Sequence, residues 1–158
     1  MNKLVSIFYN LVLGIALGSS FALAAFVAPV IFNTDIALGQ DILGRFQEGL
    51  IMTAVFKKYS ILLNITVVVI LLVEVIKFAV YKKRDYLQLG IALVVLVTSL
   101  LFTGYFAPAI IQAQTSGSGI TQTESFQALH RASVLDFSFI LVSLFVLMIK
   151  SFYTEAKT

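Results

Sequence analysis

Residues 86–123 read YLQLGIALVVLVTSLLFTGYFAPAIIQAQTSGSGITQT, a run of 38 residues without a charged side chain. A helix that crosses a membrane needs about 20 predominantly apolar residues. Over the whole chain of 158 residues, 59% are hydrophobic and 12% are charged, whereas soluble domains carry roughly 25% charged residues. A chain this short cannot bury so much apolar surface inside itself. The composition therefore excludes a soluble globular protein and predicts one that faces lipid.

Three further charge-free runs accompany this one. Residues 4–34 are long enough to span a membrane alone, while residues 59–73 and 137–149 reach that length only by including a charged neighbour. Four spanning helices are the simplest interpretation, and they form one transmembrane domain over residues 1–158. We predict an all-α, integral membrane four-helix bundle, with helices near residues 5–30, 58–80, 87–110 and 129–152.

The positive charges indicate how the helices are oriented, because cytoplasmic loops are enriched in Lys and Arg. If the N-terminus is cytoplasmic, seven basic residues lie inside: Lys3, Lys77, Lys82, Lys83, Arg84, Lys150 and Lys157. Four lie outside: Arg45, Lys57, Lys58 and Arg131. We expect both termini to be cytoplasmic. The alternative is that the first segment is a cleaved signal peptide, since Ala22-Leu23-Ala24 fits the small-residue pattern of a cleavage site.

The two halves of the chain resemble each other at an offset of 79 residues. FVAPVIFN at residues 26–33 aligns with YFAPAIIQ at residues 105–112, which superimposes the two prolines, Pro29 and Pro108, at the predicted outer ends of helices 1 and 3. One interpretation is a tandem repeat of two-helix units related by an axis along the membrane normal. The other is convergence, since Ala-Pro is a simple way to end a membrane helix.

The two outer connections differ in composition. Between Ile36 and Val55, apolar residues recur near the helical period, and Asp41 and Arg45 are spaced as an i,i+4 ion pair. This pattern predicts a short amphipathic helix on the outer surface between helices 1 and 2. Residues 112–125 are rich in Gln, Thr, Ser and Gly, which predicts a mobile loop.

Small residues on helix 1 follow four-residue spacing at Gly14, Gly18 and Ala22. Such spacing lets membrane helices approach closely. We favour packing inside the bundle over self-dimerisation for this stripe.

The fourth predicted helix carries most of the candidate functional side chains: His130, Arg131, Ser133 and Asp136. His130, Ser133 and Asp136 recur every third residue, so they share one face of the helix. If the helix starts at residue 130, Asp136 lies about 9 Å inside the membrane; if it starts at residue 134, Asp136 lies near the surface. A buried carboxylate needs a partner or a proton, and Lys57 is the candidate partner. A functional proton, metal or ligand site and a structural ion pair both remain open, with the structural pair favoured.

Other features limit the chemistry. Glu74 has Lys77 at i+3 and is expected to form a structural ion pair. The chain has no cysteine and one histidine, so His130 is the only imidazole that could bind a metal. The net charge of +3 is spread among loops, which argues against nucleic acid as a partner. We find no phosphate-binding loop, nucleophile elbow, HExxH or CxxC motif.

Several of these residues form a pattern that resembles a known family. Ala28-Pro29-Val30-Ile31-Phe32, a proline near the end of helix 3, and Phe126-x-x-Leu129-His130-Arg131-x-Ser133 resemble the bacterial domain of unknown function 4149, which is similar to transmembrane protein 205. The resemblance implies a four-helix membrane protein without an assigned activity. The architecture is more distantly similar to copper-resistance and haem-binding membrane families, although a single histidine does not supply a two-histidine haem site.

These observations predict a non-enzymatic packing or partner-binding module of the bacterial plasma (inner) membrane, without a cofactor. Its expected partners are the lipid bilayer and either a second copy of the chain or another membrane protein. Two alternatives remain: a haem- or copper-binding redox protein that uses His130, with Met52 or a second chain completing the site, and a small transporter in which Asp136 titrates.

Overall fold

The computed structural model describes residues 3–40, 42–80 and 85–156, and within these residues it contains helices and no strand. In chain order the elements are α1 (Lys3–Ala22), η1 (Leu23–Val27), α2 (Ala28–Ile31), α3 (Thr34–Leu38), α4 (Arg45–Ala79), α5 (Tyr86–Leu101), η2 (Phe102–Phe106), α6 (Ala107–Thr115), α7 (Ser118–Thr121) and α8 (Glu124–Ala156). The elements η1 and η2 are π-helical turns that join α1 to α2 and α5 to α6 without interrupting the rod.

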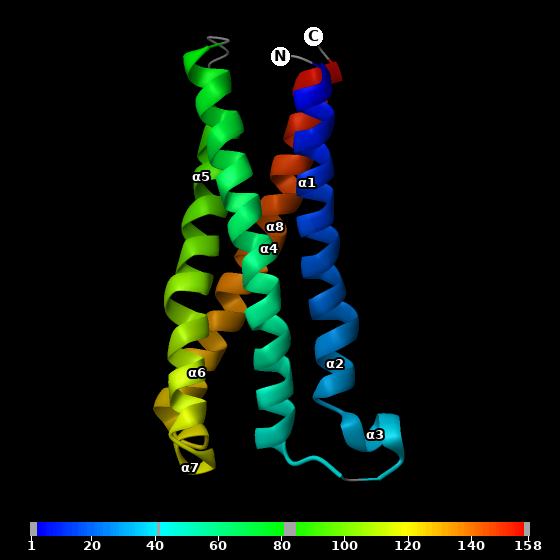
Figure 1. The fold of residues 1–158 in the computed structure, drawn as a ribbon, viewed down its shortest axis with the longest axis vertical. Coiled ribbons are helices and arrows are strands. Elements are labelled where there is room, and N and C mark those ends of the chain that lie inside the picture. The colour runs from blue at the N-terminus through cyan, green and yellow to red at the C-terminus, as the bar shows by residue number, and fades with distance from the viewer. Residues whose placement is uncertain (1–2, 41, 81–84, 157–158) are drawn as a thin grey trace.

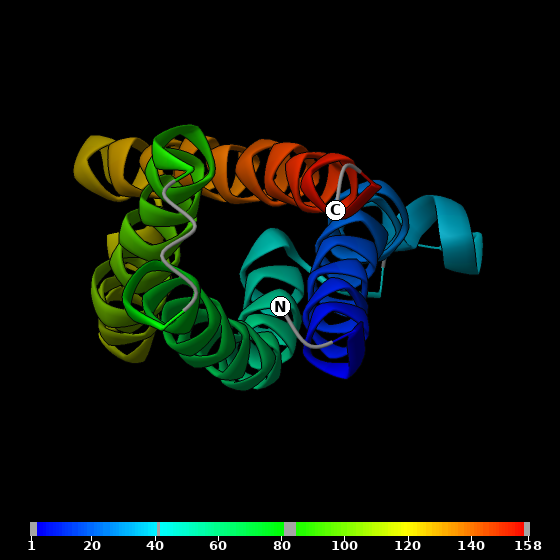
Figure 2. The same cartoon turned by 90° about the horizontal axis from the view of Figure 1, so that it is seen from above.

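Four of the resulting rods are long and apolar enough to cross a membrane: Lys3–Ile31, Arg45–Ala79, Tyr86–Thr115 and Glu124–Thr154. They pack as a ring in which α1 and α5 each contact both α4 and α8 (Figure 2). The start of α1 and the end of α8 lie at the same end of the bundle (Figure 1). The prediction of an all-α integral membrane four-helix bundle is confirmed.

The apolar side chains divide between an interior and a lipid-facing surface. The centre of the ring is filled by fully buried residues from all four rods: Leu13, Leu63, Ile70, Val95, Ile140, Leu144 and Leu147. Large apolar side chains on the outer faces, such as Ile61, Val97 and Phe139, stay more than half exposed. Each helix is therefore apolar almost all round, as expected for a membrane span.

Both prolines lie inside a helical rod. Pro29 and Pro108 are the second residues of α2 and α6, and each follows a π turn. Proline has no N–H, and its ring collides with the carbonyl four residues earlier. A wider π turn relieves this clash. The prediction that both prolines end their helices is wrong for Pro108, because α6 continues to Thr115.

The 79-residue offset recurs in the three-dimensional structure. It carries η1 onto η2, and it carries the buried positions of the first rod onto those of the third: Tyr9, Leu13, Ala16, Ser20 and Leu23 onto Gln88, Ala92, Val95, Ser99 and Phe102. Convergence on an Ala-Pro motif does not require the same buried face over about four turns. The structure therefore favours the tandem repeat.

Both connections at the end of the bundle opposite the start of α1 contain more helix than predicted. A short helix, α3, does lie between the first two rods, but α4 begins at Arg45 rather than near residue 58. The apolar period of this segment is in phase with α4, so the chain continues as one helix. The predicted ion pair between Asp41 and Arg45 involves a residue that lies outside the described ones; Arg45 pairs with Glu48, at 3.3 Å.

The predicted mobile loop at residues 112–125 is also largely helical. The α6 helix runs through Thr115, α7 follows, and the Thr123 hydroxyl accepts a hydrogen bond from the Phe126 N–H at the start of α8. The chain turns at Gly117, whose φ of 104° is accessible mainly to glycine. Local capping by Thr and Gly therefore orders a segment whose composition alone predicts a loop.

Candidate functional site: polar layers inside the bundle

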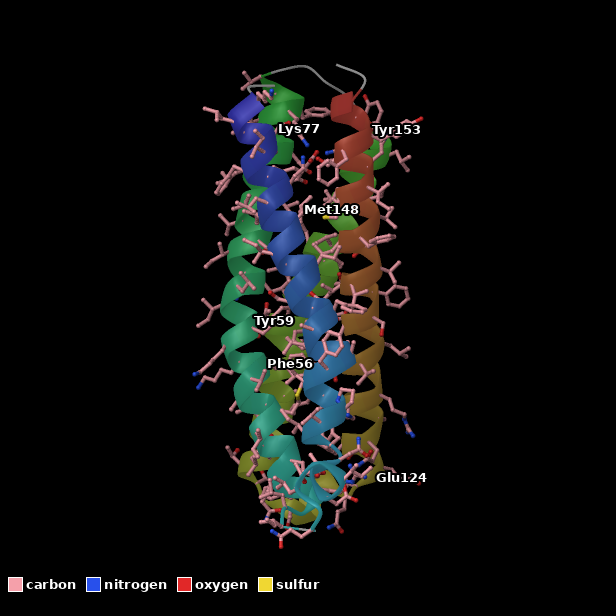
Figure 3. The ribbon with its side chains drawn as sticks, turned by 90° about the vertical axis from the view of Figure 1, so that its right-hand side faces the viewer. Phe56, Tyr59, Lys77, Glu124, Met148 and Tyr153 are labelled. Carbon is pink, nitrogen blue, oxygen red and sulfur yellow. The ribbon has the colours of Figure 1, made fainter. Side chains whose placement is uncertain are left out.

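Buried polar side chains form layers between the rods. We call the first the terminal layer (Tyr9, Glu74, Lys77 and Gln88), because it lies towards the end of the bundle where α1 begins. Figure 3 places Lys77 near that end, and Tyr59 and Phe56 farther along the bundle. We call Ser20, Tyr59, Ser99 and Asp136 the middle layer.

One carboxylate oxygen organises the terminal layer. Glu74 Oε1 accepts hydrogen bonds from the Tyr9 hydroxyl at 3.0 Å and from Gln88 Nε2 at 2.9 Å, and it pairs with Lys77 Nζ at 2.9 Å. Lys77 Nζ also lies 4.3 Å from the centre of the Tyr9 ring, a cation–π contact. These contacts join α1, α4 and α5. The prediction that Glu74 pairs with Lys77 is confirmed.

A second ion pair closes the same end of the bundle. Lys150 Nζ on α8 lies 2.8 Å from Asp85 Oδ2, and Asp85 Oδ1 accepts a hydrogen bond from the Gln88 N–H at 3.1 Å. Partial burial raises the pKa of Asp85, but the hydrogen bonds from Lys150 and Gln88 outweigh it, so the pKa lies below its ordinary value. Asp85 thus caps α5 and fixes it against α8.

In the first half of the middle layer, the polar side chains are hydrogen-bonded within the protein. Ser20 Oγ donates to the Ala16 carbonyl at 2.7 Å and lies 2.5 Å from the Tyr59 hydroxyl. Because a serine hydroxyl has one proton, the Tyr59 hydroxyl must be the donor to Ser20 Oγ. We call Ser20 and Tyr59 the closed pair, and it links α1 to α4.

The second half of the middle layer differs. Ser99 is fully buried and Asp136 is 7% exposed, yet Ser99 Oγ and Asp136 Oδ2 have no hydrogen-bond partner within the described residues. We call Ser99 and Asp136 the open pair. Ser151 Oγ, one helical turn from the end of α8, is similarly without a partner among described atoms.

Two contacts hold α8 against α5. The Asp85–Lys150 ion pair joins the two helices at one end, and the rings of Phe102 and Phe137 are 5.5 Å apart. Ser99 lies three residues before Phe102, and Asp136 directly precedes Phe137. The members of the open pair therefore belong to stretches of α5 and α8 that pack against each other.

Aromatic rings form the apolar surroundings of this level. Phe137 lies within 5.8 Å, between ring centres, of Phe56, Tyr59 and Phe102. Such edge-to-face packing excludes water and lowers the local dielectric constant. Leaving a buried polar group without a hydrogen bond in these surroundings costs about 1–3 kcal/mol, and more if the group is charged.

The charged residues on α4 and α8 indicate how deep the open pair lies. The exposed Lys57 is 20 residues from Lys77, and Arg131 is 19 residues from Lys150. Both separations correspond to about 28–30 Å of helix, the thickness of a hydrocarbon core. Asp136, five residues beyond Arg131, then lies about 8 Å inside the boundary of the hydrocarbon core marked by Lys57 and Arg131.

The predicted stripe on the fourth helix is only partly assembled. Ser133 and Asp136 are buried on the same face, and His130 is half-buried. Ser133 Oγ donates to the His130 carbonyl at 2.7 Å, and the His130 ring stacks on Phe126. Ser133 and His130 therefore meet through the backbone, and no polar contact joins either side chain to Asp136 in the described part of the chain.

The other predicted residues of this site lie on the surface. Lys57 is exposed, and the described residues contain no ion pair between Lys57 and Asp136. Arg131 is exposed and lines an open hollow with Glu124 and Gln127. Met52 is buried. Within the described ranges, no three His, Cys, Asp or Glu side chains converge as metal ligands.

The small-residue stripe divides between two environments. A Cβ built on Gly14 would lie 4.0 Å from the Met148 sulfur, so Gly14 faces α8. A Cβ on Gly18 would meet no described atom within 4 Å, and Gly18 is exposed. Ala22 is half-buried.

Residue patterns did not predict Tyr9, Ser20, Tyr59, Gln88 or Ser99 as site residues. A signal was available, because the 79-residue offset superimposes Tyr9 on Gln88 and Ser20 on Ser99. A polar residue at the same position of two charge-free segments indicates a shared inward face. Their partners on α4 and α8 could be identified only from the packing of the helices.

Comparison with known proteins gives one result. No curated protein and no solved structure shows significant similarity to the chain. The sequence profile described as a domain of unknown function, DUF4149, matches residues 11–119, from α1 into α7. The match covers more than half of the chain, and the chain therefore belongs to the DUF4149 family.

Proposed function

We propose that this protein is a non-enzymatic, cofactor-free module of the bacterial plasma membrane that binds another transmembrane helix through α1. The observation that carries the proposal is the exposed Gly18, where a side chain would meet no described atom within 4 Å. Glycine on a lipid-facing surface lets a second helix approach the backbone closely, which is how membrane helices gain packing energy.

The flanking side chains give this surface a shape suited to a helix. Ile15 and Phe21, three residues before and after Gly18, are about half exposed and project on either side of it. A partner helix would pack over Gly18 between these two side chains. A second copy of the chain is the simplest partner, because it brings the same surface.

The test compares Gly18→Leu with a control in the other half. Val97 occupies the position of Gly18 after the 79-residue offset and is also exposed. We expect two differently tagged full-length copies to co-purify from mixed membranes, Gly18→Leu to abolish this, and Val97→Leu to leave it intact. Unchanged helicity and melting temperature of Gly18→Leu would show that the fold is preserved. Co-purification that survives Gly18→Leu, or wild-type copies that never co-purify, would contradict the proposal that copies associate through α1.

We further propose that both termini are cytoplasmic. The support is the basic run of residues 82–84, which lies in the sequence between α4 and α5; the end of α4 and the start of α5 are at the end of the bundle where α1 begins. The chain has no cysteine, so a single introduced cysteine can be labelled without background. We expect a membrane-impermeant maleimide to label Gln122→Cys in intact spheroplasts and to label Lys3→Cys only after permeabilisation. The opposite labelling pattern would show that both termini lie outside the cytoplasm and would contradict the proposal.

A further inference from the structure

We propose that the helix that packs over Gly18 is α4 of a second copy, and that its Asn64 side-chain amide donates a hydrogen bond to the exposed backbone there. The inference rests on the proposed association through α1 and names the surface that the second copy presents to it. The contact is head-to-tail, because each copy uses α1 towards one neighbour and α4 towards the next. Such a contact forms a ring when its rotation closes.

Asn64 presents hydrogen-bond donors to lipid. It lies on the exposed surface of α4, and its Oδ1 accepts a hydrogen bond from the Thr103 hydroxyl at 3.0 Å. Neither N–H of the amide has an acceptor within the described residues. The hydroxyls of Thr98 and Ser138 differ, because each donates to a backbone carbonyl four residues earlier, at 2.8 and 2.9 Å. Asn64 therefore needs a partner that these hydroxyls do not need.

The membrane itself does not supply this partner. Asn64 lies seven residues from Lys57 and 13 residues from Lys77 along α4, which places it about 10 Å inside the hydrocarbon core. Water and lipid headgroups lie outside the core, where they cannot reach the amide, and a polar group without a hydrogen bond is strongly unfavourable in hydrocarbon. Its exposed neighbours on α4, Ile61 and Ile65, are apolar. A second protein surface with an acceptor is therefore needed.

The backbone at Gly18 offers such an acceptor. Gly18 is exposed, and a Cβ there would meet no described atom within 4 Å, so a second helix can reach the carbonyls beside it. A backbone carbonyl has two lone pairs, and the helix uses one of them. Asparagine side chains commonly form hydrogen bonds between membrane helices. A contact of α1 with α1 would bring only apolar side chains such as Ile15 to these carbonyls and would leave Asn64 facing lipid.

The two surfaces lie at nearly the same depth in the membrane. Copies related by rotation about the membrane normal keep each residue at its own depth, so the two surfaces must match in depth to meet. The closed pair joins α1 to α4. Counted from the closed pair towards the terminal layer, Gly18 lies two residues along α1 and Asn64 five residues along α4, which is about 3 Å and about 8 Å of helix. The difference is less than one helical turn, so α4 of one copy can place Asn64 beside Gly18 of the next.

The first test measures how much of one tagged full-length copy co-purifies with a differently tagged copy from mixed membranes. Asn64→Leu removes the donors at similar size, and we expect about threefold to tenfold less co-purified protein. Ile65→Leu, at the neighbouring exposed position, is the matched control and should co-purify as wild type does. An unchanged melting temperature of Asn64→Leu would show that the fold is preserved. If Asn64→Leu co-purifies as wild type does while Gly18→Leu does not, the association through α1 stands and the contact with α4 is overturned.

The second test locates the contact with single cysteines, which the natural chain lacks. Ile15 on α1 and Ile61 on α4 lie near Gly18 and Asn64, and both are exposed. We expect a short bis-maleimide to join Ile15→Cys copies to Ile61→Cys copies, and to join neither variant to itself. Phe139→Cys, on the exposed surface of α8, is the control and should give no product with Ile15→Cys.

The cross-linking pattern separates the two proposals. Cross-linked dimers of Ile15→Cys alone would show that α1 packs on α1, which supports the proposed function and overturns the contact with α4. Wild-type copies that never co-purify would overturn both proposals.

Discussion

The two halves of the molecule use the same positions in opposite ways. In the first half, Ser20 on α1 meets the Tyr59 hydroxyl on α4. In the second half, Ser99 occupies the position of Ser20, but α8 presents Asp136, and neither member of this pair finds a hydrogen-bond partner among the described residues. The two helical pairs therefore share the same buried positions, but their polar side chains differ. In one pair they hydrogen-bond to each other, and in the other they have no hydrogen-bond partner among the described residues.

In the terminal layer, both halves of the chain supply a hydrogen-bond donor, but only one half supplies the acceptor. Tyr9 and Gln88 occupy equivalent positions, and both donate to the same oxygen of Glu74. The donors are repeated, but the acceptor comes from α4 alone. On α8, the corresponding end of the bundle is held by Lys150 and its ion pair with Asp85. The single carboxylate thus ties the two halves together.

Removal of that carboxylate is expected to have the largest effect. Glu74→Ala leaves the ammonium group of Lys77, whose side chain is 12% exposed, without its partner. Removing one member of a buried ion pair costs about 3–5 kcal/mol. The free energy of unfolding can be measured by titration with sodium dodecyl sulfate. Glu124→Ala, at an exposed position, is the control, and equal effects of the two variants would show that the terminal layer does not stabilise the bundle.

The same substitution at two equivalent serines tests the comparison directly. Ser20→Ala removes a hydroxyl with two partners and should reduce the free energy of unfolding by about 1–2 kcal/mol. Ser99→Ala removes a hydroxyl without a partner in the described part of the chain and should be neutral or stabilising. Equal losses in both variants would contradict the difference between the closed and open pairs.

The smallest expected effect concerns the ion pair at the end of α5. Lys150→Met should cost about 1 kcal/mol, because both partners are partly exposed. Since the pKa of Asp85 is lowered in the folded state, its stabilising contribution is present above its unfolded pKa and is lost as the pH falls through the lower folded pKa. The difference in melting temperature between wild type and Lys150→Met, measured by circular dichroism, should therefore shrink as the pH is lowered. An advantage that stays constant down to the lowest pH would argue against the ion pair.

Much of the architecture could be predicted because it depends on one-dimensional properties. Charge-free length sets the number of spans, and the Glu74–Lys77 pair follows from its i,i+3 spacing. The connections between the first and second rods and between the third and fourth rods were predicted less well. The residues from Arg45 onward continue α4, and capping near Gly117 and Thr123 orders a segment that looks like a loop by composition. Helix boundaries depend on which neighbouring helix covers a segment, and composition does not report that.

The candidate site was predicted in part. Asp136 stands out because the sequence offers no local reason for a carboxylate at that depth. The proposed partner Lys57 is exposed instead, because its place on the helix turns it outward. Ser99 is one of many serines in apolar segments and cannot be singled out before the packing of α5 shows that its hydroxyl is buried without a described partner.

Four helices long enough to cross a membrane could be predicted from the sequence alone, because the number of spans follows from the transfer of apolar surface out of water and from helix length, which are local properties. The sequence left the tandem repeat open, and the matching buried positions of the first and third rods favour it. Which polar groups satisfy one another is a property of the tertiary structure. A hydrogen bond acts over about 3 Å, so whether Tyr59 reaches Ser20 and whether Asp136 is left open depends on the relative rotation and register of separate helices.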